Sequence, residues 1–348
     1  MKKFDTLSVL VFVRSWGITT LLVALGIFFS IWDAPIFGTL DNFSLLLGSS
    51  SISAIFAAAI AMGAYSGALD LSVPGTAAVA SVSMAMVIGA GGDPITAMLL
   101  ALVIGTAVGL FNGLIVQTGL NPLAVTIGTL SITSGLAAIL TNGLPLYDKM
   151  ENLGWLGTSN YFNFEIGDFV FSGIPSTFFV VAVIYVIGTI FLTKTRGGIR
   201  FLAAGGNAEA LRRSGVNSNI YRLLGFTLSG LIAAIGGIVT SAYTAQATPQ
   251  APTAVLFDGL TAVALSGLSL AGGRGSLPKV WVGAMVIAVI GNGLLIKNIQ
   301  PFWTISITGA LLILALAGEH YIGKAVAKQA VAKSNVSAHK EVKTAGAK

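Results

Sequence analysis

The chain has 348 residues, of which 55% are hydrophobic and only 9% are charged, and its mean hydropathy is +0.87. Soluble domains carry roughly 25% charged residues, so this composition excludes an ordinary soluble protein and indicates a polytopic membrane protein. The net charge of +6 gathers at the edges of apolar runs and in the C-terminal tail, with no aromatic-rich basic face for nucleic acid. The absence of Cys excludes disulfides, Cys-based metal sites and thiol catalysis.

Ten apolar runs predict an all-α fold of about ten transmembrane helices, because one span needs about 20 residues. The first run follows Lys2 and Lys3 and is interpreted as an uncleaved span, since no small-residue cleavage site stands out. Gly-rich sequence flanks the third and eighth runs, and broken helices are expected somewhere in the fold. The predicted spans cover residues 9–32, 43–67, 71–90, 95–116, 122–140, 176–192, 223–243, 255–270, 280–296 and 301–317.

The polar segments between spans predict the orientation of the chain. Residues 141–175 contain four acids and one Lys, whereas residues 194–222 contain six Lys or Arg residues and one acid. Cationic loops remain on the cytoplasmic side, so residues 194–222 and both termini are expected in the cytoplasm and residues 141–175 outside. We therefore expect a transmembrane domain over residues 1–319 and a flexible, basic cytoplasmic tail over residues 320–348.

The cytoplasmic segment contains a predicted short helix. Its signals are an N-cap at Asn207, an acid in the first turn at Glu209, cations in the last turn at Arg212 and Arg213, and a stop at Gly215. Such a helix suits a transporter that must dock a separate ATPase. The alternative is that the cations only fix the topology.

Two acids lie at membrane depth, where an acid must find a partner or water. Asp70 lies in G-A-L-D-L-S-V-P-G, and Asp258 lies in L-F-D-G-L. One interpretation is a broken helix at Asp70 and Ser72 that lines a transport path. The alternative is that each acid caps the helix that follows it.

Asn112 and Asn292 lie near the ends of the fourth and ninth spans, in F-N-G-L and G-N-G-L. This likeness predicts a 5+5 repeat in which spans two to five are echoed by spans seven to ten, with opposite orientation in the membrane. Gly105, Gly109 and Gly113 are four residues apart and predict a close helix contact.

Five motifs, in order over roughly residues 40 to 317, resemble the ribose-type permeases of bacterial ABC importers, which are the sugar branch of the binding-protein-dependent transport family. The motifs are G-A-L-D-L-S-V, G-L-F-N-G-L-I-V, P-L-A-V-T-I-G-T-L-S-I-T-S-G-L-A, A-A-G-G-N-A-E-A-L-R-R-S-G-V and A-L-S-G-L-S-L-A-G-G-R-G-S-L. The chain departs from the family pattern at Pro74, which is inserted before Gly75.

The resemblance implies a permease subunit in a bacterial inner membrane that moves a small polar solute, such as ribose or a related sugar, by alternating access. Its implied partners are a second permease subunit, identical or homologous, cytoplasmic ATPases and an extracytoplasmic binding protein. The resemblance also implies that the segment from Gly205 and Gly206 to Gly215 meets the ATPase. ATP must bind to that partner, because the nearest approach to a P-loop, at residues 188–195, lacks the second glycine.

Other functions remain open on the sequence. A nucleoside or another small solute could replace the sugar. An ion-driven secondary transporter would need Asp70 and Asp258 to titrate or to bind an ion. A membrane enzyme would need a nucleophile, base and metal constellation, and the sequence has none; His320 and His339 are its only histidines, so no metal or other cofactor is expected on this chain.

Overall fold

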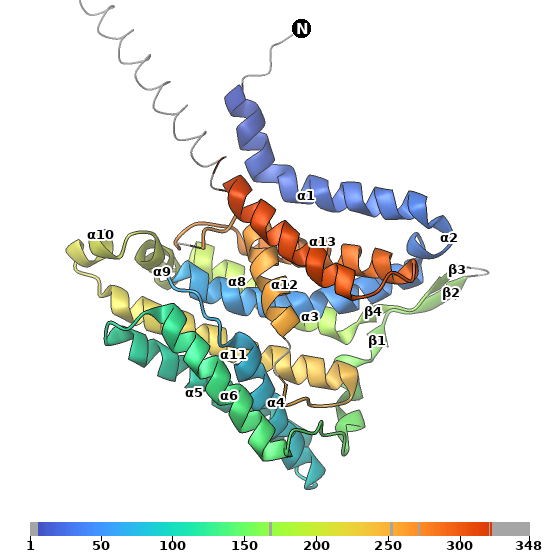
Figure 1. Cartoon of the computed structure of the whole chain (residues 1–348), viewed down its shortest axis with the longest axis horizontal. Helices are drawn as coiled ribbons and strands as arrows, with labels where there is room; N and C mark the ends of the chain where they lie inside the picture. Colours follow the sequence, from blue (N-terminus) through green and yellow to red (C-terminus); the bar gives the residue numbers. More distant parts are fainter. Residues whose placement is uncertain (1–5, 167–168, 251–252, 271, 320, 322–348) are drawn as a thin grey trace, which may run out of the picture.

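The fold is given by a computed structural model that describes residues 6–166, 169–250, 253–270, 272–319 and 321 (Figure 1). The predicted all-α membrane fold is confirmed, because eight helices in this part of the chain are long and apolar enough to cross a membrane. They are α1 (Thr6–Trp32), α3 (Leu40–Tyr65), α5 (Pro94–Gln117), α6 (Pro122–Thr141), α8 (Ser176–Lys194), α11 (Ser218–Thr244), α13 (Leu277–Ile296) and a last helix, Phe302–Glu319.

Two shorter apolar helices, α4 (Val73–Gly89) and α12 (Thr253–Leu265), occupy the predicted third and eighth spans. All ten predicted spans therefore correspond to helices, and the two flanked by Gly-rich sequence are the short ones. The predicted tail over residues 320–348 lies outside the described residues, apart from Tyr321.

Short elements gather at the two ends of the helix bundle. One end carries α9 (Arg196–Gly206) and α10 (Ala208–Arg213), and the opposite end carries the strands of the segment between α6 and α8 (Figure 1). The remaining elements are α2 (Ala34–Phe37), a 3₁₀ helix η1 (Met150–Leu153), α7 (Gly154–Gly157), β1 (Asn160–Tyr161), β2 (Phe164–Ile166), β3 (Phe169–Phe171) and β4 (Ile174–Pro175). The antiparallel pairs are β1 with β4 and β2 with β3, and the sequence analysis predicted none of these strands.

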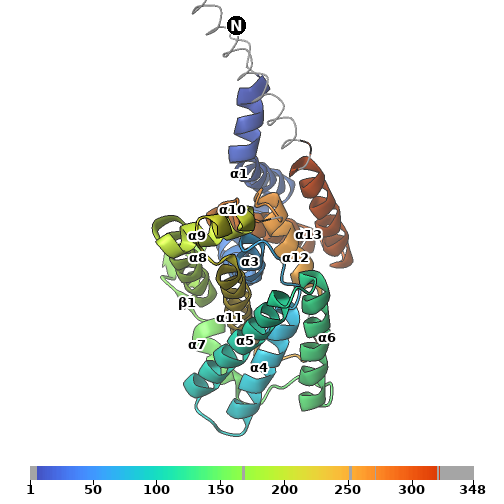
Figure 2. The same cartoon turned by 90° about the vertical axis from the view of Figure 1, so that its left-hand side faces the viewer.

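Two long helices, α3 and α11, form the centre of the molecule. They pack against each other, α5 and α4 pack on α11, and α13 and α12 pack on α3. In Figure 2, α4, α5 and α6 accordingly lie on one side of α3 and α11, and α1 and α13 lie on the other. Few residues of Ser15–Trp32, within α1, and of the last helix are buried, as expected of helices at a lipid boundary or subunit contact.

The pairing of helices has an internal symmetry. If α3 is exchanged with α11, α4 with α12 and α5 with α13, then the α5–α11 contact becomes the α13–α3 contact. The α4–α11 contact likewise becomes α12–α3, and α4–α5 becomes α12–α13. The sequence analysis predicted that spans two to five are repeated in spans seven to ten. Such a repeat pairs α3 with α11, α4 with α12 and α5 with α13, as the contacts do.

Small residues let α5 and α11 approach closely. A Cβ atom added at Gly105 would lie 2.5 Å from the Cβ of Ala234, and one at Gly109 would overlap the carbonyl oxygen of Phe226. One at Gly113 would lie 2.6 Å from Leu223 Cδ1. The predicted close contact at these three glycines is therefore confirmed, and its partner is α11.

Candidate functional site

A buried polar network holds the break between α3 and α4. Asp70 Oδ1 accepts hydrogen bonds from the Ser72 amide, at 3.0 Å, and from the Ser72 hydroxyl, at 2.6 Å. Asn112 Nδ2 donates to Ser72 Oγ at 2.9 Å, and Thr129 Oγ1 donates to Asn112 Oδ1 at 2.6 Å. Since Asn112 lies on α5 and Thr129 on α6, one network joins the break to two further helices.

The network is almost fully enclosed, because Asp70 and Ser72 are each 1% exposed and Asn112 is 0% exposed. The hydroxyl of Ser229, on α11, also interacts with the Asp70 carboxylate, although Asp70 Oδ2 and Ser229 Oγ do not reach the geometry of an ordinary hydrogen bond with any described residue. Three of the predicted pathway residues, Asp70, Ser72 and Asn112, thus lie together. Thr129 was missed by the sequence analysis, because one Thr in an apolar span has no local signal.

The other two predicted pathway residues lie elsewhere. Asn292, on α13, donates to Asn42 Oδ1 at 2.8 Å, which ties α13 to the start of α3. Asp258 is half-buried in the second turn of α12, close to Thr308 of the last helix. The interpretation of Asp258 as an N-cap is therefore wrong, because α12 begins five residues before it.

The short helix predicted after Asn207 is confirmed as α10, with the expected cap. Asn207 Oδ1 accepts from the Ala210 amide at 2.9 Å, and Gly215 has a φ of +83°, which an L-residue rarely adopts. Glu209 forms ion pairs with Arg212 and with Arg213 on the same helix. All three charged side chains are at least half exposed, so α10 presents them to solvent.

A second helix, α9, precedes α10 and was not predicted. Its amphipathic face buries Phe201 at 0% exposure, and Thr195 caps its start by accepting from the Gly198 amide at 2.9 Å. Repeated glycines obscured this helix in the sequence, because glycine lowers intrinsic helix propensity by about 1 kcal/mol. The structure shows that α9 anchors the base of α10.

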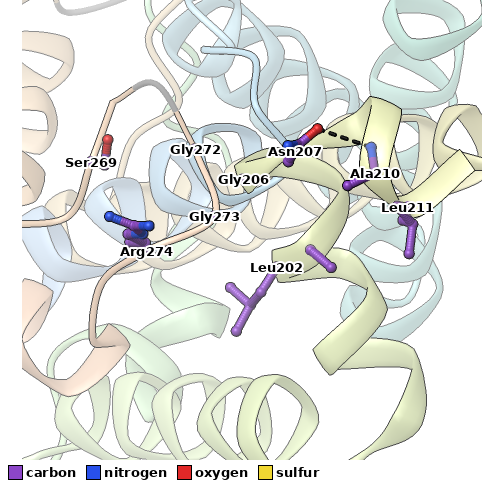
Figure 3. A pocket seen from close by; sticks show the side chains of 10 residues that line it. Leu202, Gly206, Asn207, Ala210, Leu211, Ser269, Gly272, Gly273 and Arg274 are labelled. Carbon is purple, nitrogen blue, oxygen red and sulfur yellow. Dashed lines mark hydrogen bonds between the residues drawn. The ribbon is translucent and has the colours of Figure 1, made fainter. Parts of the chain in front are cut away.

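A pocket of about 590 Å³ lies between these helices and the loop that joins α12 to α13 (Figure 3). Leu202, Gly206, Asn207 and Leu211 line one wall, and Ser269, Gly272, Gly273 and Arg274 line the other. Arg274 is exposed, and no ion pair to it is found among the described residues. The pocket is open, polar on one side and cationic, which suits contact with another protein more than enclosure of a small solute.

The loop residues Ser269 and Arg274 were also missed as site residues. The loop forms a tight turn before α13, with positive φ angles at Gly272, Gly273 and Gly275. Its proximity to the predicted ATPase-coupling residues depends on tertiary packing. No group of three or more His, Asp or Glu residues that could hold a metal occurs within the described residues.

Comparison with known proteins agrees with this architecture. Residues 42–316 match the family described as the permease component of branched-chain amino acid transport systems. The chain is 28% identical over 312 residues to the ribose import permease RbsC of Escherichia coli K12, covering 88% of this chain and 94% of the relative. It is 30% identical over 276 residues to RbsC of Bacillus subtilis strain 168, covering 79% and 83%.

A solved structure supports the fold alone. A metal-chelate type ABC transporter in an inward-facing conformation aligns with a TM-score of 0.50 at 13% identity, covering 90% of this chain and 98% of that one. The match to the family extends from the start of α3 almost to the end of the last helix and so includes both polar features described above. The chain therefore belongs to the family of permease components of branched-chain amino acid transport systems.

Proposed function

We propose that this chain is the membrane-spanning permease subunit of an ABC importer that moves a monosaccharide such as ribose. Membership of the permease family supports the transport role, and two relatives named as ribose import permeases favour a sugar. The chain acts in a bacterial inner membrane with a second permease subunit, identical or homologous, and with lipid around the helices. A binding protein delivers the sugar from outside.

The proposed mechanism is alternating access driven by ATP that binds to separate cytoplasmic subunits. ATP binding closes the ATPases, and α9 and α10 carry that movement to the spans. The permease itself performs no covalent chemistry and holds no ATP. The permease opens the path to one face of the membrane at a time. Along that path, the sugar hydroxyls exchange hydrogen bonds with water for weak polar contacts with the protein.

One observation carries this proposal: the exposed, capped helix α10 beside an open cationic pocket. Replacing Glu209 and Arg212 together with Ala removes an exposed ion pair, and such pairs contribute only about 0–1 kcal/mol to stability. The variant should therefore insert normally. In proteoliposomes with the ATPase and the binding protein, it should lose sugar-stimulated ATP hydrolysis and ribose uptake.

The control is Glu151→Ala, which removes an exposed acid from η1, in the segment between α6 and α8. This control should transport ribose at the parental rate. Normal coupling in the Glu209 and Arg212 double variant would refute a docking role for α10. Loss of coupling in both variants would mean that charge in general, and not this helix, is responsible.

A further inference from the structure

Four glycines from three separate segments meet at the base of the cytoplasmic helices. Gly67 follows α3, Gly205 lies in the last turn of α9, and Gly272 and Gly273 lie between α12 and α13. We propose that this glycine junction (Gly67, Gly205, Gly272 and Gly273) is the rigid link that carries displacement of α9 and α10 to the break at Asp70. The proposal rests on the proposed function, since it assumes that an ATPase moves α10.

The contact at the junction is made by backbone atoms without intervening side chains. A Cβ atom added at Gly205 would overlap the carbonyl oxygen of Tyr65, the last residue of α3, and would lie 2.9 Å from the Gly273 nitrogen. One added at Gly67 would lie 3.2 Å from the Gly205 Cα. The Gly273 amide also donates to Tyr65 O at 3.4 Å. Backbone groups in direct contact cannot yield by changing rotamer, so displacement of one segment must move the others.

The junction leads directly into the buried network. Only two residues separate Gly67 from Asp70, and the Asp70 carboxylate holds Ser72 at the start of α4. From Ser72, hydrogen bonds reach Asn112 and then Thr129, on α5 and α6. A shift of α9 can therefore reach three spans, first through backbone contacts at the partly buried glycines and then through the hydrogen bonds of the buried network.

Two glycines of α9 provide a matched test. Gly205→Ala places a methyl group inside the junction. Gly197→Ala, at the start of the same helix and outside the segment expected to meet the ATPase, places one 3.6 Å from the Phe191 Cε2, at ordinary contact distance. Neither glycine has a positive φ, so both variants differ from the parent mainly in the space that they fill. The measurements are ribose uptake, ATP hydrolysis and ATPase binding in proteoliposomes that contain the complete importer.

We expect Gly205→Ala to bind the ATPase and hydrolyse ATP but to transport about tenfold less sugar per ATP, because overlap in a close-packed contact is hard to relieve. Gly197→Ala should behave as the parent does. Equal transport in both variants would overturn the proposal. Loss of ATPase binding in Gly205→Ala would also overturn it, because the glycine would then belong to the docking surface. Failure of the Glu209 and Arg212 variant to uncouple would instead refute the proposed function.

A second measurement does not depend on how the variants fold. In the unmodified importer, amide hydrogen exchange of residues 65–73 and 272–275 should change together when ATP binds to the ATPase. Hydrogen exchange could instead change in α9 and α10 (residues 196–213) but in neither of these two segments. That result would show that the motion stops at α9 and that the junction is not a link.

Discussion

At the scale of single residues, Asp70 is held by hydrogen bonds that its side-chain oxygen accepts from Ser72. An Asn side chain at this position could accept the same bonds. The Asp70 Oδ1 accepts both bonds from Ser72, and the carboxylate also interacts with Ser229. The sequence singled out Asp70 and Ser72 because an acid at membrane depth stands where a helix breaks, and it singled out Asn112 because of its likeness to Asn292. It could not pair them, since 40 residues separate Ser72 from Asn112.

We predict that Asp70→Asn keeps most transport, because the amide oxygen can still accept from Ser72. Asp70→Leu removes the acceptor for both the Ser72 amide and the Ser72 hydroxyl, and a buried donor left without an acceptor costs about 1–3 kcal/mol. The Leu variant should therefore accumulate less and unfold at a lower temperature in detergent, as measured by fluorescence of the purified permease. Equal stability of the two variants would show that the Asp70 bonds do not hold the break.

At the scale of elements, long apolar helices were predictable and short irregular elements were not. All ten spans follow from runs of hydrophobic residues, and α10 follows from Asn207 and Gly215. The strands between α6 and α8 were missed because each has only two or three residues, too few to show alternation.

The contact between α5 and α11 gives a prediction at this scale. Gly105→Ala should destabilise the permease by about 1–3 kcal/mol through overpacking against α11, even though Ala favours helix. Gly128→Ala on α6 is the matched control, because a Cβ atom there meets nothing within 4 Å. Thermal unfolding in detergent should show a lower midpoint for the first variant only. An unchanged midpoint for Gly105→Ala would mean that α5 and α11 can move apart to admit the methyl group with little loss of stability.

At the scale of the whole molecule, the two halves exchange packing partners as an internal repeat does. The sequence predicted such a repeat from the likeness of Asn112 and Asn292. The packing adds the exchange of α3 with α11 as central helices. The environments of the two Asn side chains differ, since Asn112 bonds to Ser72 and Thr129 but Asn292 bonds to Asn42. The sequence could not predict this difference, because the hydrogen-bond partners of each Asn lie on other helices and are known only once the helices are packed.

Orientation in the membrane can be tested with single Cys variants, since the chain has no native Cys and background labelling should be absent. Asn160→Cys lies in β1 and Asn219→Cys lies at the start of α11, and both positions are exposed. In intact cells, an impermeant thiol reagent should label the first variant, and it should label the second only after permeabilisation. The reverse pattern would overturn the orientation derived from the distribution of cations.

The central claim is that ATP hydrolysed by a partner, and not an ion gradient, drives sugar uptake through this chain. The direct measurement is uptake of radiolabelled ribose by proteoliposomes that contain the permease, its ATPase and its binding protein. Uptake would be compared with and without ATP, and with and without an imposed proton or sodium gradient. We predict uptake that requires ATP and does not respond to the gradient. Uptake that requires the gradient and proceeds without ATP would contradict the account and would make Asp70 and Asp258 candidates for ion coupling.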